Sequence, residues 1–197
     1  MSFCLRMATK NDKLEIAKAM VAASGGICDF LLGHLPAPLS PHKILSLEVA
    51  RDESRLSYRN ALIASLQQAV IGVMLFYDWA LLTKQTEQRL IDTTKLDCFK
   101  PFYDFELQNT YYIDTVYVHP AHRKQGLGKQ MIAWLENHIL KNQSATGINQ
   151  LSLYVWANNR AAIQLYRRVG FDLYKSIHSL PHPEFAAQER WLMLKKL

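Results

Sequence analysis

The chain has 197 residues, of which 49% are hydrophobic and 20% are charged. This length fits one domain with an insertion, and the composition provides enough apolar surface for a core. The longest apolar run, 69–77, is far shorter than the roughly 20 residues that cross a membrane, and residues 1–6 lack the apolar stretch of a secretory signal. We therefore expect a cytoplasmic protein with no membrane partner, formed by one domain over residues 1–197.

The distribution of charge narrows the choice of partner. The formal net charge is +6 at pH 7, which suits nucleic acid, an anionic membrane surface or a small polyanion. Four basic residues, His122, Arg123, Lys124 and Lys129, surround two glycines, whereas most other basic residues alternate with acidic ones. This pattern favours a local phosphate site over an extended nucleic-acid track, so we expect no nucleic-acid partner.

The cysteines indicate neither disulfides nor a metal site. Cys4, Cys28 and Cys98 are odd in number and lie far apart in the sequence. Zinc ligands usually come in closely spaced pairs, and this pattern is missing. We expect buried, reduced thiols and no bound metal.

The N-terminal region predicts a strand followed by helices. Alternating residues at 3–7 indicate the strand, and Asn11 or Asp12 is the expected N-cap of a helix that ends at the glycines 25–26. The buried stripe of this helix is predicted to consist of Leu14, Ala17, Met20 and Val21. A short apolar segment at 27–32 and a second helix at 42–51 follow.

A β-hairpin is predicted next, with strands at 60–66 and 69–77 joined by Gln67 and Gln68. Residues 79–108 mix charged and aromatic side chains without a sustained period, which predicts an inserted helix and loop. The later elements are strands at 111–118, 150–155, 172–177 and 190–194, with helices at 126–141 and 159–169. Because strands and helices alternate without strict βαβ regularity, we expect an α/β protein with a mixed sheet and helices on both faces.

The most informative stretch is 116–129, which reads V-Y-V-H-P-A-H-R-K-Q-G-L-G-K. Pro120 stops the preceding strand, and Gly126 and Gly128 allow backbone N–H groups to come close to a ligand. The unpaired amides of a first helical turn, the helix dipole and the nearby basic side chains all favour an anion. This stretch therefore predicts a pyrophosphate site.

Two common nucleotide motifs do not fit this stretch. Lys129 is followed by Gln130, and no earlier glycine completes the spacing of a Walker loop. Met131 occupies the position where the dinucleotide fingerprint requires a third small residue. Neither ATP nor NAD is supported.

A second motif follows at matching order within 158–171. The patterns Val118-x-Pro-x-x-Arg-x-x-Gly-x-Gly and Asn159-x-x-Ala-x-x-x-Tyr-x-x-x-Gly-Phe together resemble the GCN5-related N-acetyltransferase (GNAT) superfamily. The resemblance covers roughly residues 110–171. It implies the acyl-CoA N-acyltransferase fold, with a central, twisted, mostly antiparallel sheet, and acetyl-CoA as co-substrate.

The resemblance also implies which residues bind acetyl-CoA. The pantetheine arm would pair with the main chain at Val116 and Val118, and the Val118 N–H would polarise the thioester carbonyl. Asn159 matches a position that hydrogen-bonds this arm, although capping of the following helix would also explain it. The pyrophosphate would lie on Arg123, Lys124, Gln125, Gly126, Leu127, Gly128 and Lys129.

Two residues are candidates for proton transfer. Tyr166 matches the general acid of the family, which protonates the departing thiolate, and packing on the sheet is its alternative role. An alkylamine with a pKa near 10.4 needs a base at pH 7. Asp114 shares a strand face with Val116 and Val118 and is the candidate base, acting through a water. Its alternative role is to bind a cationic acceptor or to pair with an arginine or lysine.

The expected function is direct acetyl transfer from acetyl-CoA to a primary amine of a small molecule, such as a polyamine or another cationic amine. The alternatives are acetylation of a protein N-terminus or lysine, and a catalytically silent acyl-CoA-binding module. The expected partners are the amine acceptor and, as an option, a second copy of the chain in a homodimer.

Overall fold

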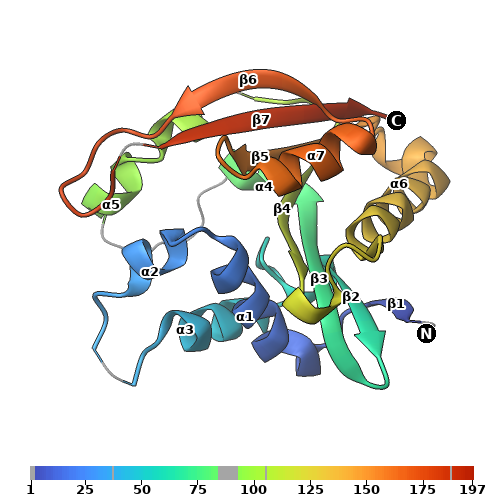
Figure 1. Cartoon of the computed structure of the whole chain (residues 1–197), viewed down its shortest axis with the longest axis horizontal. Helices are drawn as coiled ribbons and strands as arrows, with labels where there is room; N and C mark the ends of the chain where they lie inside the picture. Colours follow the sequence, from blue (N-terminus) through green and yellow to red (C-terminus); the bar gives the residue numbers. More distant parts are fainter. Residues whose placement is uncertain (1–2, 37, 84–92, 105, 187) are drawn as a thin grey trace. The chain divides into compact units, whose positions relative to one another are not determined.

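The structure is a computed structural model that describes residues 3–36, 38–83, 93–104, 106–186 and 188–197 (Figure 1). Its seven strands have the order β1-β2-β3-β4-β5-β7-β6. The chain divides into two compact units, residues 1–76 with 114–131 and residues 77–113 with 132–197. Strand β4 (Thr110–Val118) and helix α6 (Leu127–Thr146) each run from one unit into the other.

The described residues of the first unit form an antiparallel sheet, three complete helices and the start of α6. Strand β1 (Cys4–Met7) pairs with β2 (Ala61–Leu66), which pairs with β3 (Ala69–Asp78). The turn between β2 and β3 consists of Gln67 and Gln68, whose φ angles are 48° and 69°. Positive φ at both central residues matches the right-handed twist of a two-residue hairpin, and the predicted hairpin is confirmed.

Helices α1 (Lys13–Ala23), α2 (Ile27–Leu32) and α3 (Pro41–Val49) complete this unit, and α1 packs against α3 (Figure 1). The predicted stripe of α1 is partly wrong. Ala17 and Met20 are buried as expected, but Leu14 is 45% exposed and Val21 is half-buried. Ile16 and Ala19 are buried in their place, which rotates the buried face of the helix from the predicted one.

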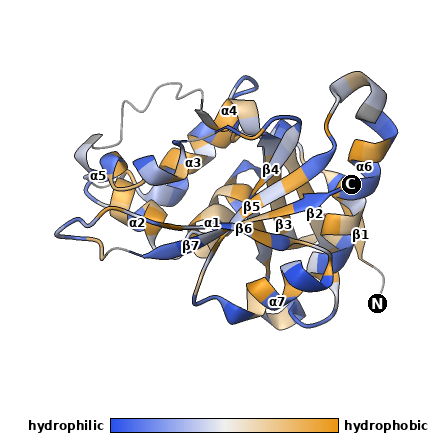
Figure 2. Ribbon diagram, turned by 90° about the horizontal axis from the view of Figure 1, so that it is seen from above, coloured by the Kyte–Doolittle hydropathy of each residue, from blue (hydrophilic) through white to orange (hydrophobic). Residues whose placement is uncertain are grey.

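The core of the first unit is centred on β3. Residues 71–76 are buried in succession, whereas an ordinary half-exposed strand would alternate between buried and exposed positions. Hydrophobic residues accordingly dominate this strand (Figure 2). Continuous burial means that both faces of β3 are covered.

The second unit holds the beginning of β4 and three further strands. Thr110–Ile113 of β4 pairs in parallel with β5 (Gln150–Trp156), and β5 pairs antiparallel with β7 (Glu189–Lys196). Strand β6 (Asp172–His178) pairs antiparallel with β7 at the end of the strand order. The helices are α4 (Trp79–Thr83), α5 (Thr93–Asp97), α7 (Arg160–Arg168) and most of α6. The sheet is mixed and mostly antiparallel, as predicted.

Strand β6 has an irregular outer edge. Its register against β7 shifts between Leu173 and Lys175, so Tyr174 is an extra residue on β6. Tyr174 is 58% exposed, and its neighbour Leu173 is 44% exposed. This arrangement is a β-bulge at the last strand of the order.

The cysteines are less uniformly buried than predicted. Cys98 is buried, and burial raises the pKa of its thiol. Cys28 is half-buried and Cys4 is exposed, because β1 is the first strand of the order and its side chains are only partly covered. None of the described helices is both long enough and apolar enough to span a membrane.

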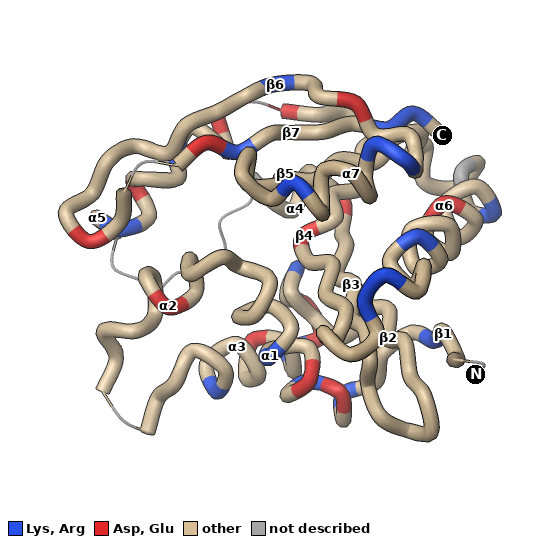
Figure 3. Tube along the Cα trace, viewed as in Figure 1, with Lys and Arg blue, Asp and Glu red and all other residues tan. Residues whose placement is uncertain are grey.

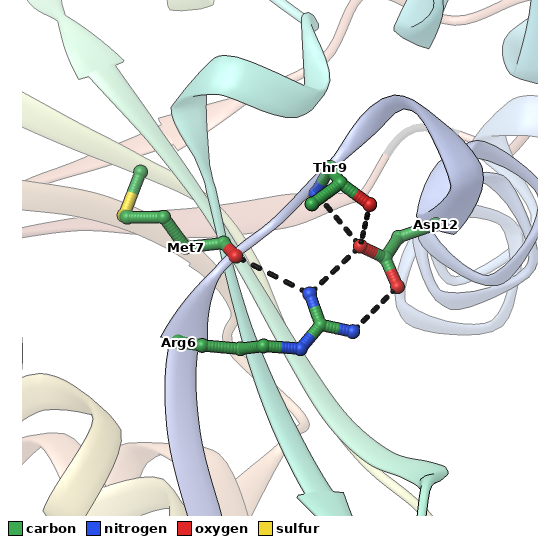
Figure 4. A network of polar contacts seen from close by, with 4 residues as sticks. All are labelled: Arg6, Met7, Thr9 and Asp12. Carbon is green, nitrogen blue, oxygen red and sulfur yellow. Dashed lines mark hydrogen bonds and ion pairs between the residues drawn. The ribbon is translucent and has the colours of Figure 1, made fainter.

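A charged network joins the end of β1 to the start of α1 (Figure 4). Both terminal nitrogens of Arg6 donate to the two carboxylate oxygens of Asp12, each at 2.8 Å. The N–H of Thr9 donates to the same carboxylate at 2.7 Å, and its hydroxyl donates at 3.0 Å. These bonds, with the Arg6 hydrogen bond the largest cause, lower the pKa of Asp12 from 3.8 to about 2.

We predict that Asp12→Asn lowers the free energy of unfolding by about 1–2 kcal/mol at pH 7, since Arg6 is partly exposed and its charge is screened. The folded-state pKa lies below the unfolded one, so this contribution is present above about pH 5 and is lost as the pH falls from about 4 to 2. Denaturant unfolding at pH 7 and near pH 2 measures both effects. Asp52→Asn, in an exposed pair with Arg59, is the control. An equal loss for Asp12→Asn at both pH values would contradict the charge argument.

Candidate active site

The end of β4 presents three of the predicted residues. Asp114, Val116 and Val118 are all half-buried, and Thr115 between them is buried. The two-residue period of a strand places the first three on one face, as predicted. The Asp114 carboxylate accepts a hydrogen bond from the Thr115 hydroxyl at 2.9 Å, which holds it at the side of the strand.

The loop between β4 and α6, residues 119–126, is closed by contacts at its base. The N–H of His119 donates to the carbonyl of Ile71 on β3 at 2.8 Å. Pro120–His122 forms a short 3-10 turn. The Nε of Arg123 then donates to the carbonyl of Val118 at 2.9 Å. Arg123 therefore braces the loop in addition to any contact with a ligand. His119 is exposed, whereas His122 is half-buried.

Two residues of this β4–α6 loop have left-handed backbone conformations. The φ angle of Lys124 is 61° and that of Gly126 is 80°. A Cβ atom built on Gly126 would meet no other atom within 4 Å. The backbone of Gly126 thus borders open space, and a glycine there leaves that space available for the approach of a ligand.

Helix α6 begins at Leu127, one residue later than predicted, and Gly128 lies in its first turn. Leu127 and Gly128 are buried, and Lys129 is exposed. The N–H of Gln130 donates to the carbonyl of Gly126 at 3.1 Å. The N–H groups of Leu127, Gly128 and Lys129 precede this bond and, by helix geometry, point out of the helix end.

This end of α6 has the properties of an anion site. The outward amides and the helix dipole provide positive potential, and the nearby residues Arg123, Lys124 and Lys129 add three charges. Figure 3 shows basic residues at this end of α6. All three side chains are exposed, so their charges are screened by water and a bound anion would gain most from the backbone amides. The Gln125 side chain donates to the carbonyl of Ala121 at 3.3 Å and stabilises the loop.

Helix α7, in the second unit, carries the other two predicted residues. Asn159 is its N-cap, and the side-chain oxygen accepts from the N–H of Ala162 at 3.2 Å. The alternative of helix capping is therefore what the structure displays for Asn159. A role toward the pantetheine arm would have to use the amide nitrogen of the same side chain, and it stays a prediction.

Tyr166 is 8% exposed, and burial raises the pKa of its phenol to about 12. Its ring meets the ring of Phe171 edge to face, with centroids 5.9 Å apart. This contact forms because Gly170, with a φ angle of 94°, ends the helix, and the Phe171 N–H returns to the Tyr166 carbonyl at 3.0 Å. The tyrosine, glycine and phenylalanine of the motif thus form one helix end. The phenol stays protonated at neutral pH and can donate a proton.

The described part of the predicted insertion is packed within the second unit. The Leu180 N–H donates to the carbonyl of Cys98 at 2.8 Å, and Lys95 forms an ion pair with Glu184. Phe99 meets Phe185 edge to face at 5.6 Å. These contacts attach the insertion to the β6–β7 connection, residues 179–188. Residues 84–92 and 105 of the insertion lie outside the described residues.

A cavity of about 410 Å³ that is largely open to solvent lies where the insertion meets the β6–β7 connection. Its lining comes from Lys100, Pro101, Tyr103, Asp104 and Leu180. Lys100 pairs with Asp97 at 2.8 Å, and no described basic side chain forms a salt bridge with Asp104. The cavity therefore combines a carboxylate with aromatic and apolar surface.

Sequence reasoning missed Ile71 and Gly72. The carbonyl of Ile71 holds the base of the β4–α6 loop, and Gly72 lies against the first turns of α6. The only local signal is a glycine inside an otherwise apolar strand, which often marks a bulge or a close approach of another segment.

Solved structures share this fold. One is an N-acetyltransferase from Staphylococcus aureus Mu50, with 21% sequence identity, a TM-score of 0.71, and coverage of 97% of this chain and 99% of that one. Another is yncA from Salmonella typhimurium with its cofactor acetyl-CoA, with 18% identity, a TM-score of 0.62, and coverage of 100% and 95%. A third, the PaiA N-acetyltransferase from Thermoplasma acidophilum in complex with coenzyme A, has 16% identity, a TM-score of 0.56 and full coverage of both chains.

A comparison with curated proteins found no significant match. Residues 37–171 match the model of the acetyltransferase (GNAT) family. This range spans more than half of the chain and includes β4, the β4–α6 loop, the start of α6 and α7. The chain therefore belongs to the acetyltransferase (GNAT) family.

Proposed function

We propose that this protein transfers the acetyl group of acetyl-CoA directly to a primary amine of a small molecule. The observation that carries the proposal is the anion site at the start of α6, where outward amides lie beside the open space over Gly126. The site occurs at the motif of an acetyltransferase family, and two of the similar structures contain acetyl-CoA or coenzyme A. A pyrophosphate fits the charge and the backbone geometry of this helix end.

Three further groups are proposed to carry out the proton transfers and to stabilise the reacting carbonyl. The amine must lose a proton before it attacks the thioester, and the departing thiolate must gain one. Asp114, acting through a water, is the proposed acceptor of the first proton, and Tyr166 is the proposed donor of the second. The main-chain N–H of Val118 would stabilise the charge that develops on the carbonyl oxygen. No serine or cysteine occurs in either motif, so we propose transfer without an acyl-enzyme.

The cavity between the insertion and the β6–β7 connection supports a cationic acceptor. Asp104 offers a carboxylate, and Tyr103 offers an aromatic face that attracts ammonium groups. Pro101 and Leu180 add apolar surface. The acceptor class that suits this lining is a small molecule with an amine and an apolar portion.

Thiol release from acetyl-CoA, measured with polyamines, amino acids, aminoglycosides and short peptides, tests this function. We expect release with small cationic amines, and Asp104→Asn should raise the KM of that amine roughly tenfold, because a charged contact is lost. The KM of acetyl-CoA should not change. Asp172→Asn, on an exposed residue of β6 outside the cavity lining, is the matched control.

Other results would change the proposal in defined ways. Release with peptides alone would identify a protein or peptide acetyltransferase. Binding of acetyl-CoA without release on any acceptor would indicate a silent acyl-CoA-binding module. If Asp104→Asn raised both KM values equally, the cavity would not be the acceptor site.

The anion site makes a separate prediction. Gly126→Val should abolish measurable acetyl-CoA binding in calorimetry, because the side chain enters the open space beside the amides. Arg123→Ala should weaken binding less, and its effect should shrink at high salt. Gly147→Val is the matched control, since Gly147 also has a positive φ, 67°, and would suffer similar backbone strain. Unchanged affinity for acetyl-CoA in Gly126→Val would show that the pyrophosphate does not bind at this helix end.

The proposed acid and base should be separable by pH. Tyr166→Phe keeps the ring contact with Phe171 and should lower kcat by about 10²- to 10⁴-fold with little change in acetyl-CoA affinity. Because burial raises the pKa of Tyr166 to about 12, the phenol stays protonated from pH 7 to 10, and the defect should persist over that range. Asp114→Asn should instead approach wild-type kcat as the pH nears the pKa of the amine.

Rates must be compared where the chemical step limits turnover, which a pre-steady-state burst measurement establishes. Wild-type kcat in Tyr166→Phe under those conditions would reduce Tyr166 to a packing residue. A defect in Asp114→Asn that is the same at pH 7 and pH 10 would assign Asp114 to acceptor binding and not to proton removal.

A further inference from the structure

Strand β3 contains one residue more than β2 near its beginning. Ala64 of β2 is opposite Gly72, but the next residue, Ser65, is opposite Val70. Ile71 is therefore left without a partner on β2. Such a bulge bends the strand and redirects the backbone groups of the extra residue.

The redirected carbonyl of Ile71 has a specific acceptor role. It receives the N–H of His119 at 2.8 Å, at the point where β4 ends and the β4–α6 loop begins. Ile71 is buried, with 6% of its surface exposed, whereas His119 is exposed. The first end of the loop is thus fixed to the bulge.

The other end of the loop is fixed by the adjacent residue. A Cβ atom built on Gly72 would lie 3.2 Å from the Met131 sulfur and 3.3 Å from Leu127 Cδ2 and Ala64 Cβ. Leu127 and Met131 are the first and fifth residues of α6 and are buried. The start of α6 therefore lies directly on the backbone of β3, at a distance that only glycine permits without movement of its neighbours.

We propose that Ile71 and Gly72 form a seat that fixes both ends of the β4–α6 loop, and that Gly72 is a positioning residue for acetyl-CoA binding. The inference rests on the proposed function for its consequence, the affinity for acetyl-CoA. The amides that would hold the pyrophosphate belong to Gly126–Lys129, between the two fixed ends. A side chain at position 72 lifts α6 while His119 stays bound to Ile71, and the loop between them changes shape.

The proposed effect is one of geometry, because Gly72 has no side chain with which to touch a ligand. Displacements near 1 Å in a binding site reduce affinity or rate by up to about 10²-fold. Alanine would require its three neighbours to move by a few tenths of an ångström. Valine carries two further methyl groups, so we expect a larger displacement.

The test compares Gly72→Val with Gly72→Val/Met131→Ala. Valine adds about as many atoms as the change from methionine to alanine removes, so the double variant restores the space under α6. Calorimetry with acetyl-CoA and with CoA should give a Kd at least about tenfold higher for Gly72→Val, and within about threefold of wild type for the double variant. Hydrogen exchange of amides 119–130, measured without ligand, should rise and recover in parallel. The control is Ala69→Val, which adds bulk at an exposed position of the same strand.

Each outcome decides one part of the inference. Folded Gly72→Val with wild-type affinity and wild-type exchange overturns it, and so does failure of Met131→Ala to restore either quantity. If Gly72→Val does not fold, Gly72→Ala should raise the Kd for acetyl-CoA about two- to threefold. Its hydrogen exchange at amides 119–130 should rise as well. If the wild-type protein binds no acetyl-CoA, the proposed function fails, while the exchange measurement still decides whether Gly72 positions the loop.

Discussion

Helix α6 begins where its first turns rest on the backbone of β3, and the packing at Gly72 makes this approach possible. The consequence is that a helix end with outward amides is held on a buried strand and not on a surface loop. Arg123 closes the β4–α6 loop on the carbonyl of Val118, and His119 joins it to β3. The backbone of a loop whose basic side chains are exposed is thereby bonded at two points, and anion recognition by amides requires such a fixed arrangement.

In the second unit, burial changes the acid–base property of a side chain, the phenol of Tyr166. Tyr166 faces Phe171 at the end of α7, and removal from water favours the neutral phenol over the phenolate.

The insertion is held by hydrogen bonds and ring contacts to the β6–β7 connection and to β5. One of these is the hydrogen bond that the Tyr154 hydroxyl donates to the carbonyl of Phe102 at 2.8 Å. Residues distant in the sequence thus line one cavity.

Local sequence patterns correctly predicted the elements that depend on neighbouring residues alone. The hairpin at Gln67 and Gln68 followed from two apolar runs separated by two residues, and the β4–α6 loop followed from Pro120 and the glycines. The bulge at Ile71 could not be predicted, because it depends on the register between two strands and not on either strand alone. The exposure of Leu14 depends likewise on which face of α1 meets α3. The attachment of the insertion to residues 179–188 joins segments about 80 residues apart, and no periodicity within either segment signals it.

The bulge at Tyr174 has a consequence for how this protein behaves among its own copies. A strand at the end of a sheet offers unpaired backbone groups, and a second chain can add to them when the edge is flat and regular. In β6 the extra residue interrupts the repeat of donors and acceptors, and the adjacent Lys175 adds an exposed charged residue next to the bulge. The exposed Tyr174 and Leu173 therefore lie on an irregular backbone that disfavours pairing with a strand of another copy. Aggregation through β6 is opposed even though these side chains are partly apolar.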